Sequence, residues 1–144
     1  VVDGWTQAYS TEFSGSSGKG DRPIVVSYSS SPAAEVLFAD PPTDVAPTGV
    51  APLTCFEQIE YAGILRGTKH QAEAQLLIDY LTGTTFQSDL PLTQFVFPVN
   101  ADATIPESFT RYISHPERAL TIEYNVIAEN RAAWLDEWST IVFK

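Results

Sequence analysis

Apolar side chains recur at every third or fourth position near the start of the chain. They occupy Trp5, Ala8, Tyr9 and Phe13, which is the spacing of one face of an amphipathic helix. The segment 14–20 that follows consists mainly of serine and glycine, and both residue types favour turns over helix interiors. The pattern therefore predicts a short helix that ends near Phe13.

A compact run of β-branched residues comes next. Pro23–Tyr28 contains the sequence Ile-Val-Val, and a short continuous apolar run is typical of a buried strand in a parallel sheet. The polar turn after it leads into a second helix, with Ser31 as the expected N-cap and Pro32 as the first helical residue. Strand, polar turn and helix in this order predict an α/β fold, an open sheet flanked by helices.

Two more helices are predicted in the second half of the chain. Thr68 and Gln71 have capping-box spacing, and Gly83 is a natural C-terminal stop for the helix that follows them. Asn125 is the expected cap of a final helix, which should pack firmly because its apolar face is continuous. That face is formed by Leu135, Trp138, Ile141 and Val142, with Trp134 beside it, and both tryptophans are expected in the core.

The remaining segments are predicted to be extended or irregular. Asp40–Pro52 is rich in proline and has little periodicity, which indicates a surface loop. Cys55–Leu65 has the composition of an extended segment. Phe95–Val99 is predicted as a short strand, and its proline indicates an edge position or an exit from the sheet.

Composition and charge restrict the class of protein. The chain has 144 residues, 44% hydrophobic and 18% charged, which is typical of one soluble globular domain. Its formal net charge of -10 repels nucleic acid and anionic lipid surfaces and favours a cation, although acidity in many proteins only maintains solubility. The chain starts at Val1 without a secretory leader, so we expect a mature form or an excised fragment.

Cysteine and histidine are too few to suggest a metal centre. Cys55 is the single cysteine, so neither an internal disulfide nor a thiolate cluster can form within the chain. His70 and His115 are far apart in the sequence, and both are expected at the surface. The sequence therefore predicts no metal site and no cofactor.

No apolar run approaches the roughly 20 residues of a membrane-spanning helix.

Three stretches of the sequence carry a family resemblance. They are Gly4–Tyr9 (Gly-Trp-Thr-Gln-Ala-Tyr), Val26–Ala33 (Val-Ser-Tyr-Ser-Ser-Ser-Pro-Ala) and Arg131–Trp138 (Arg-Ala-Ala-Trp-Leu-Asp-Glu-Trp), and Phe97–Val99 also fits. Their order and spacing along nearly the whole chain resemble those of thiamine-binding receptors of ABC importers. The resemblance implies a non-enzymatic, extracytoplasmic receptor, periplasmic or lipid-anchored at the cell surface. It would capture thiamine or its phosphate esters and deliver them to a membrane permease.

The resemblance also implies an architecture. The family is about twice as long as this chain and has the two-lobe type II periplasmic-binding-protein fold, so the chain would be its C-terminal portion, without the N-terminal half. Residues of about 1–60 and 100–144 would form part of one lobe. Residues of about 61–99 would supply a hinge strand and part of the other lobe. Ligands of open α/β sheets bind beyond the carboxyl ends of the strands, where Tyr28–Ser31 is expected.

Aromatic residues in the matching stretches are the first candidates for ligand binding. Thiamine carries an electron-poor pyrimidine and a cationic thiazolium, so its receptor needs aromatic faces for stacking and cation-π contact. Trp5 and Tyr28 are the leading candidates, and Tyr9 is a weaker one. The alternative is that each is an ordinary core aromatic.

The candidate polar contacts are serines. Ser29, Ser30 and Ser31 lie at a predicted helix N-terminus, where amide groups and the helix dipole favour a hydroxyl or a phosphate ester. The alternative is that Ser31 only caps the helix.

Phe95 marks a departure from the family, which usually has a tryptophan just before the Tyr-Pro or Phe-Pro step. Phenylalanine is a poorer cation-π partner and lacks the indole donor. Affinity or ligand choice could therefore differ at this position.

Three other functions are weighed against thiamine capture. An enzyme has little support, because the sequence contains no nucleophile elbow, phosphate-binding loop or metal-ligand run. A receptor of the same fold for ferric iron, a polyamine or another cation is the second alternative. The third is an interaction module that uses an exposed aromatic patch.

Overall fold

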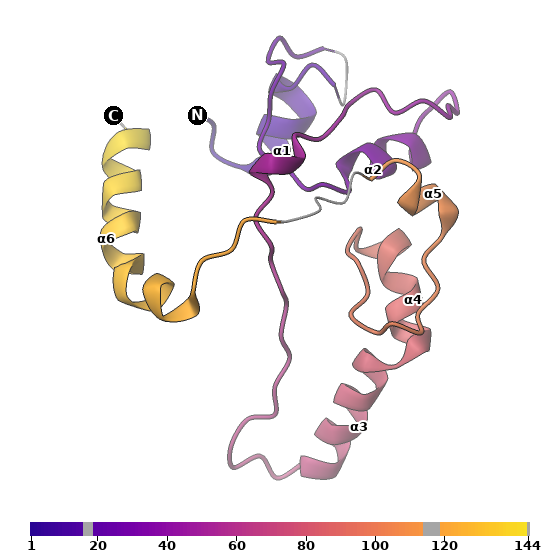
Figure 1. Ribbon diagram of the computed structural model, residues 1–144, viewed down its shortest axis with the longest axis vertical. Helices are drawn as coiled ribbons and strands as arrows, with labels where there is room; N and C mark the ends of the chain where they lie inside the picture. The colour runs from indigo at the N-terminus through magenta and orange to yellow at the C-terminus, as the bar shows by residue number, and fades with distance from the viewer. Residues whose placement is uncertain (16–18, 114–118, 144) are drawn as a thin grey trace. The chain divides into compact units, whose positions relative to one another are not determined.

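A computed structural model describes residues 1–15, 19–113 and 119–143 (Figure 1). The chain forms two compact units. The first consists of Val1–Val26, Ala51–Glu57 and Pro116–Lys144, and the second of Ser27–Val50 and Gln58–His115. His115 and part of the serine- and glycine-rich segment 14–20 lie outside the described residues, so the expectations for them stay predictions.

The first unit opens with the predicted amphipathic helix. Its α-helical part, α1, comprises Trp5–Gln7 and continues directly into a π-helical turn, η1, at Ala8–Glu12. The face predicted to be apolar contains the two buried side chains of this region, Tyr9 and Phe13. The spacing of apolar residues thus located the helix correctly, and its predicted apolar face is buried at Tyr9 and Phe13 but not at Trp5.

A close approach of two backbone segments follows this helix. The Ser14 amide donates to the Arg22 carbonyl at 2.9 Å, and the Arg22 amide donates to the Glu12 carbonyl at 3.0 Å. Gly20 makes the approach possible, because a Cβ atom there would lie 2.1 Å from the Glu12 carbonyl oxygen. Only glycine fits this position without a backbone shift.

A second backbone pairing in the first unit joins residues far apart in the sequence. After a short 3-10 helix, η2, at Pro52–Thr54, Phe56 forms an isolated parallel bridge with Leu120. The Leu120 amide donates to the Cys55 carbonyl at 2.7 Å, and the Glu57 amide donates to the Leu120 carbonyl at 3.1 Å. These two hydrogen bonds connect Ala51–Glu57 to the C-terminal segment of the unit.

The last helix, α6, differs from its prediction in how it packs. It comprises Tyr124–Val142 and begins after Glu123, without a side-chain hydrogen bond at its cap, so the expected capping by Asn125 is wrong. None of its residues is buried, and Trp134, Leu135, Trp138 and Ile141 are all exposed. The expectation of firm docking, with both tryptophans in a core, is therefore also wrong. An apolar face shows which side of a helix can pack, but not whether a partner surface is present.

The second unit contains four helices (Figure 1). They are α2, Ser31–Leu37; α3, Gln71–Thr82; α4, Thr84–Thr93; and α5, Glu107–Thr110. Helix α3 is predicted correctly, and Gly83 ends it as expected. The predicted capping box is absent, because α3 has no side-chain cap and Thr68 instead accepts a hydrogen bond from the His70 amide at 3.2 Å. Helix α4 is not predicted, because it contains Pro91 and several threonines, which disfavour helices.

The core of the second unit is small. Ala33, Phe109 and Ile113 form its buried cluster, and Phe95, Phe97 and Tyr112 pack against it. Phe97 contacts the ring of Phe109 edge-on, with ring centroids 5.0 Å apart.

The buried amide of Gln87 on α4 supports this arrangement. Its Nε2 donates to the Leu81 carbonyl at 2.7 Å, and its Oε1 accepts from the Val99 amide at 2.8 Å. The side chain therefore ties the end of α3 to the segment after Phe95. His70, at the start of α3, is exposed as predicted.

The segments predicted as strands do not pair into a sheet. Across the described residues, β pairing is limited to two isolated bridges, Phe13 with Arg22 and Phe56 with Leu120. Ile24 and Val26 are 85% and 91% exposed, so the expected buried strand at Pro23–Tyr28 is wrong for this structure. Phe95–Val99 likewise has no strand. A β-branched run becomes a buried strand only where neighbouring strands satisfy its backbone groups, and these segments have no such neighbours.

The described residues contain no helix that combines the length and the apolar character needed to span a membrane.

Candidate functional site

The predicted site residues fall in both units. Trp5 and Tyr9 belong to the first unit, and Tyr28, Ser29, Ser30 and Phe95 belong to the second.

The candidates of the first unit form an aromatic ladder along one helical face. The rings of Trp5 and Tyr9 are stacked, with centroids 4.8 Å apart and planes at 15°. Tyr9 and Phe13 continue the ladder with centroids 5.6 Å apart. This contact follows from the sequence, because residues four apart lie above one another on a helix.

Burial separates the roles of the two candidates in this ladder. Trp5 is 47% exposed, whereas Tyr9 is 7% exposed. Trp5 therefore offers ring surface to a solute, and Tyr9 lies beneath it as a support. This arrangement favours Trp5 over Tyr9 as a contact for a flat ligand.

In the second unit, the candidates Tyr28–Ser30 form a tight turn at the start of α2. The Ser31 amide donates to the Tyr28 carbonyl at 3.0 Å, and Ser27 Oγ and Ser31 Oγ share a hydrogen bond of 2.8 Å. Tyr28 is 64% exposed, Ser29 is partly buried and Ser30 is buried.

The helix start differs by one residue from its prediction. Ser30, not Ser31, takes the N-cap position, and no side chain caps the helix. The Ser30 carbonyl accepts hydrogen bonds from the amides of Ala33 and Ala34 at 3.1 and 3.2 Å. Pro32 lies in the first turn of α2, where its missing amide hydrogen would have no partner within the helix.

Phe95 has an unusual backbone conformation. Its φ angle is 56°, a left-handed value that costs a non-glycine residue about 1–2 kcal/mol. Its ring packs against the core cluster of the second unit and meets the ring of Phe38, with centroids 5.6 Å apart and planes at 65°. A bulky residue in this conformation is held there by its surroundings.

The sequence analysis did not single out Phe38, whose ring meets that of Phe95. It follows directly after α2 as the C-cap residue and is 73% exposed. The available signal was an aromatic residue just beyond a helix, which by itself is common on protein surfaces.

Helix α2 separates the two groups of aromatic candidates in the second unit. Tyr28 precedes its first residue, Ser31, and Phe38 follows its last, Leu37. At a rise of 1.5 Å per residue, the backbone positions of Ser31 and Phe38 lie about 10 Å apart along the helix. A ligand that touches both Tyr28 and the Phe38–Phe95 pair must therefore be elongated.

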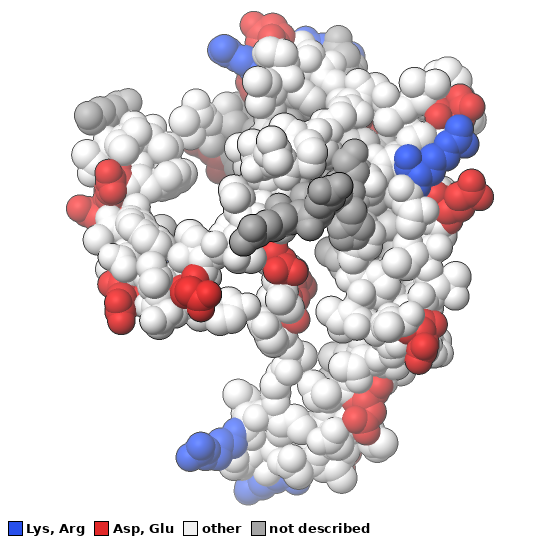
Figure 2. Space-filling model, viewed as in Figure 1, with Lys and Arg blue, Asp and Glu red and all other residues white. Residues whose placement is uncertain are grey.

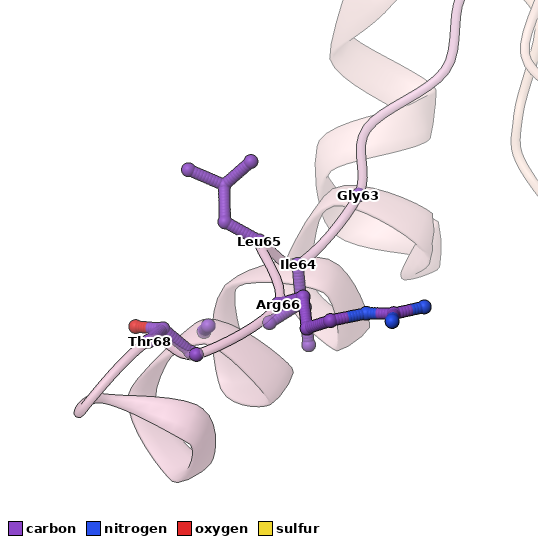
Figure 3. Close-up of a pocket in the computed structure, with 7 residues that line it drawn as sticks. Gly63, Ile64, Leu65, Arg66 and Thr68 are labelled. Atoms are coloured by element: carbon purple, nitrogen blue, oxygen red, sulfur yellow. The ribbon is translucent and has the colours of Figure 1, made fainter.

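None of these residues lines the open depression in the second unit that is drawn in Figure 3. It has a volume of about 500 Å³ and is lined by Gly63–Thr68 and Ala74. Gly67 has a φ of +84° and permits the turn in which the Thr68 amide donates to the Leu65 carbonyl at 3.2 Å. Arg66 on its wall, followed by Lys69 and His70 in the sequence, makes it a poor site for a cation.

Acidic side chains do not gather at one place on the face seen in Figure 2, where Asp and Glu occur at many separate points. Within the residues that the structure describes, no three His, Cys, Asp or Glu side chains are grouped so that they could hold a metal ion.

Comparison with known proteins shows sequence similarity to ligand-binding proteins of the periplasm. The similar proteins are named thiamine-binding periplasmic proteins. The one from Brucella suis biovar 1 is 31% identical over 139 residues, which cover 96% of this chain and 39% of the relative. The one from Escherichia coli is 28% identical over 142 residues, which cover 99% of this chain and 41% of the relative.

These matches confirm the resemblance that the sequence motifs predicted. The chain spans about 40% of the length of the curated relatives that it matches, which is consistent with the expectation of a part of such a protein. No protein-family model and no solved structure matches the chain.

Proposed function

We propose that this chain is part of the substrate-binding component of an ABC importer. In this proposal, the protein captures thiamine or one of its phosphate esters outside the cytoplasm, carries out no chemistry on it and delivers it to a membrane permease. The observation that carries the proposal is the similarity of nearly the whole chain to proteins named thiamine-binding periplasmic protein.

The accessible aromatic rings support this proposal. Trp5 and Tyr28 are both well exposed, as a ring must be if it is to stack on a ligand. Each stacking or cation-π contact contributes about 0.5–2 kcal/mol. Ser29 and Ser30 are the proposed polar contacts, and Phe95 is a proposed contact in the second unit.

The architecture is proposed on the same basis. We infer that the protein has the two-lobe periplasmic-binding-protein fold with an open sheet, as the family resemblance implies. The exposed apolar run around Ile24 and Val26 would then pair with strands that this chain does not supply. The same reasoning assigns about 1–60 and 100–144 to one lobe and about 61–99 to a hinge strand and part of the other.

Titration of thiamine into the 144-residue chain, followed by NMR chemical shifts of its aromatic rings, tests the function. We expect weak binding or none by the 144-residue chain alone, because tight capture of a small ligand requires walls that bury most of its surface. Spermidine and ferric iron, titrated in parallel, test the alternative cargoes. The proposal fails if one of the other cations shifts the aromatic signals and thiamine does not.

Replacement of the two leading aromatic residues tests the site. In the full-length protein, Trp5→Ala and Tyr28→Ala should each weaken thiamine binding at least tenfold, which corresponds to about 1.4 kcal/mol, because each removes a ring face. Trp134→Ala and Tyr61→Ala are the matched controls, since they remove exposed rings of the same types elsewhere in the same units. Unchanged binding in both test variants would remove Trp5 and Tyr28 from the site.

A further inference from the structure

The dipeptide Asp3–Gly4 places a carboxyl group next to a backbone amide that no side chain of its own residue shields. It is the one Asp-Gly pair in the chain, and the chain contains no Asn-Gly pair. Both residues are exposed. The pair lies directly before α1, with Gly4 as the N-cap and Trp5 as the first helical residue. A carboxyl group and an amide that are both accessible to water are therefore adjacent where the first helix begins.

The surroundings of the Gly4 amide leave it open to reaction. Among the described residues its N–H group donates no hydrogen bond, whereas the Gly4 carbonyl accepts one from the Ala8 amide at 3.1 Å. A Cβ atom at Gly4 would meet nothing within 4 Å, so the space beside this backbone is empty of protein. Glycine also lets the backbone rotate more freely than any other residue does. Neither hydrogen bonding nor packing therefore protects this peptide bond.

We propose that Asp3–Gly4 is a modification site at which isoaspartate forms spontaneously. The Gly4 nitrogen attacks Cγ of Asp3, and a C–N bond forms while the carboxyl hydroxyl leaves as water with the amide proton. The product of this step is a five-membered succinimide ring. Water then adds to one of the two ring carbonyls. Opening at Cγ restores aspartate, whereas opening at the backbone carbonyl leaves the chain connected through Cγ as isoaspartate. Water is the only co-reactant, and nothing is oxidised or reduced.

The modification changes the backbone but neither the mass nor the number of carboxylates. Isoaspartate inserts the Cβ carbon of Asp3 into the main chain and leaves the carboxylate directly on Cα. The insertion lies before the Gly4 carbonyl, which accepts the hydrogen bond from Ala8. The helical turn that follows therefore keeps this hydrogen bond, while the segment that leads to Trp5 becomes one atom longer.

Asp102 provides a comparison within the same chain. It is exposed, as Asp3 is, but the residue after it, Ala103, carries a Cβ atom. The Ala103 amide also donates to the Asn100 carbonyl at 3.1 Å, and the Asp102 amide donates to Asn100 Oδ1 at 2.9 Å. These hydrogen bonds hold the Asp102–Ala103 peptide in a turn, so Asp102 should form isoaspartate much more slowly than Asp3.

The test is prolonged incubation of the whole 144-residue chain in mildly acidic buffer, followed by proteolytic digestion and mass spectrometry. The peptide that contains Asp3 should separate with time into two chromatographic peaks of equal mass, and an isoaspartyl methyltransferase should label one of them. Gly4→Ala should slow this conversion severalfold, because a Cβ atom hinders the attack, while the extended φ of -174° at Gly4 is open to alanine. Asp3→Glu should abolish it, since the longer side chain would have to close a six-membered ring.

A synthetic peptide with the sequence Val1–Tyr9, incubated in parallel, gives the rate for the same bond without the fold. Conversion in the peptide but not in the protein would overturn the proposal, because the fold would then protect the bond. Conversion at Asp102 as fast as at Asp3, or an unchanged rate in Gly4→Ala, would also overturn it, because Gly4 would then have no role of its own. An absence of isoaspartate in both peptide and protein would do the same. None of these results depends on thiamine binding, so the proposed function is tested separately.

Discussion

At the scale of single residues, Gly20 shows how one backbone contact depends on the absence of a side chain. A Cβ atom at this position would lie 2.1 Å from the Glu12 carbonyl oxygen. Gly20→Ala should therefore separate the two backbone segments and open the hydrogen bonds between Ser14 and Arg22 and between Arg22 and Glu12. We expect the Ser14 and Arg22 amides to exchange their hydrogens at least tenfold faster, equivalent to about 1.4 kcal/mol.

Gly4→Ala is the control for this prediction, because a Cβ atom at Gly4 meets nothing within 4 Å. Exchange rates at the Ser14 and Arg22 amides should stay unchanged in this variant. If Gly20→Ala also left them unchanged, the close approach would not be a feature of the chain in solution.

Residue patterns pointed to aromatic rings that the structure leaves accessible. The motifs around Trp5 and Tyr28 drew attention to two rings that are in fact accessible, whereas Tyr9, in the same motif as Trp5, is buried beneath it. The helical spacing of Trp5 and Tyr9 is visible in the sequence, but which of the two faces solvent is not. The contact between Phe38 and Phe95 could not be predicted from the sequence, because it joins residues that are distant in the chain.

At the scale of elements, most helices were predicted correctly from local patterns, whereas strands, which depend on partners elsewhere in the chain, were not. The helices near Trp5, at Gln71–Thr82 and at Tyr124–Val142 were all predicted from periodicity, because a helix satisfies its own backbone groups. A strand depends on a partner elsewhere in the chain, so the strand at Pro23–Tyr28 was predicted from composition alone and does not form. Helix α4 was not predicted because it contains Pro91, and its contacts outweigh the low helix propensity of that residue.

The tie made by Gln87 between two segments can be tested directly. Gln87→Leu keeps the bulk of the side chain but leaves the Leu81 carbonyl and the Val99 amide without their partner. Hydrogen bonds of this kind contribute about 0.5–1.5 kcal/mol each, and these two are only partly shielded from water, Val99 being 74% exposed. The midpoint of urea unfolding, followed by circular dichroism, should therefore fall. Gln75→Leu serves for comparison, since the Gln75 amide donates to Asp79 on the exposed surface of α3, and this variant should shift the midpoint little.

At the scale of the whole molecule, apolar surface is the dominant feature. Buried hydrophobic side chains are few among the described residues, while many large apolar side chains are exposed in both units. A chain of this length normally buries most of its apolar surface. The relatives are longer than this chain, so surface that is accessible here need not be accessible in a protein of their length.

Helix α6 exposes several large apolar side chains. Leu135, Trp138 and Ile141 lie open to water on one helix, and a contiguous apolar stripe binds hydrophobic dyes. We expect the chain to enhance the fluorescence of anilinonaphthalene sulfonate. Leu135→Lys and Trp138→Lys should each reduce that enhancement without lowering the helical signal in circular dichroism, since neither side chain is packed in a core.

The exposed stripe on α6 therefore bears on the solubility of the chain. A reduction of helical content in the two lysine variants would mean that α6 is held by packing after all, and unchanged dye fluorescence would mean that the stripe is covered in solution. If neither occurs, charged substitutions on α6 are a direct route to a more soluble chain, because they remove exposed apolar surface at positions that are not packed in a core.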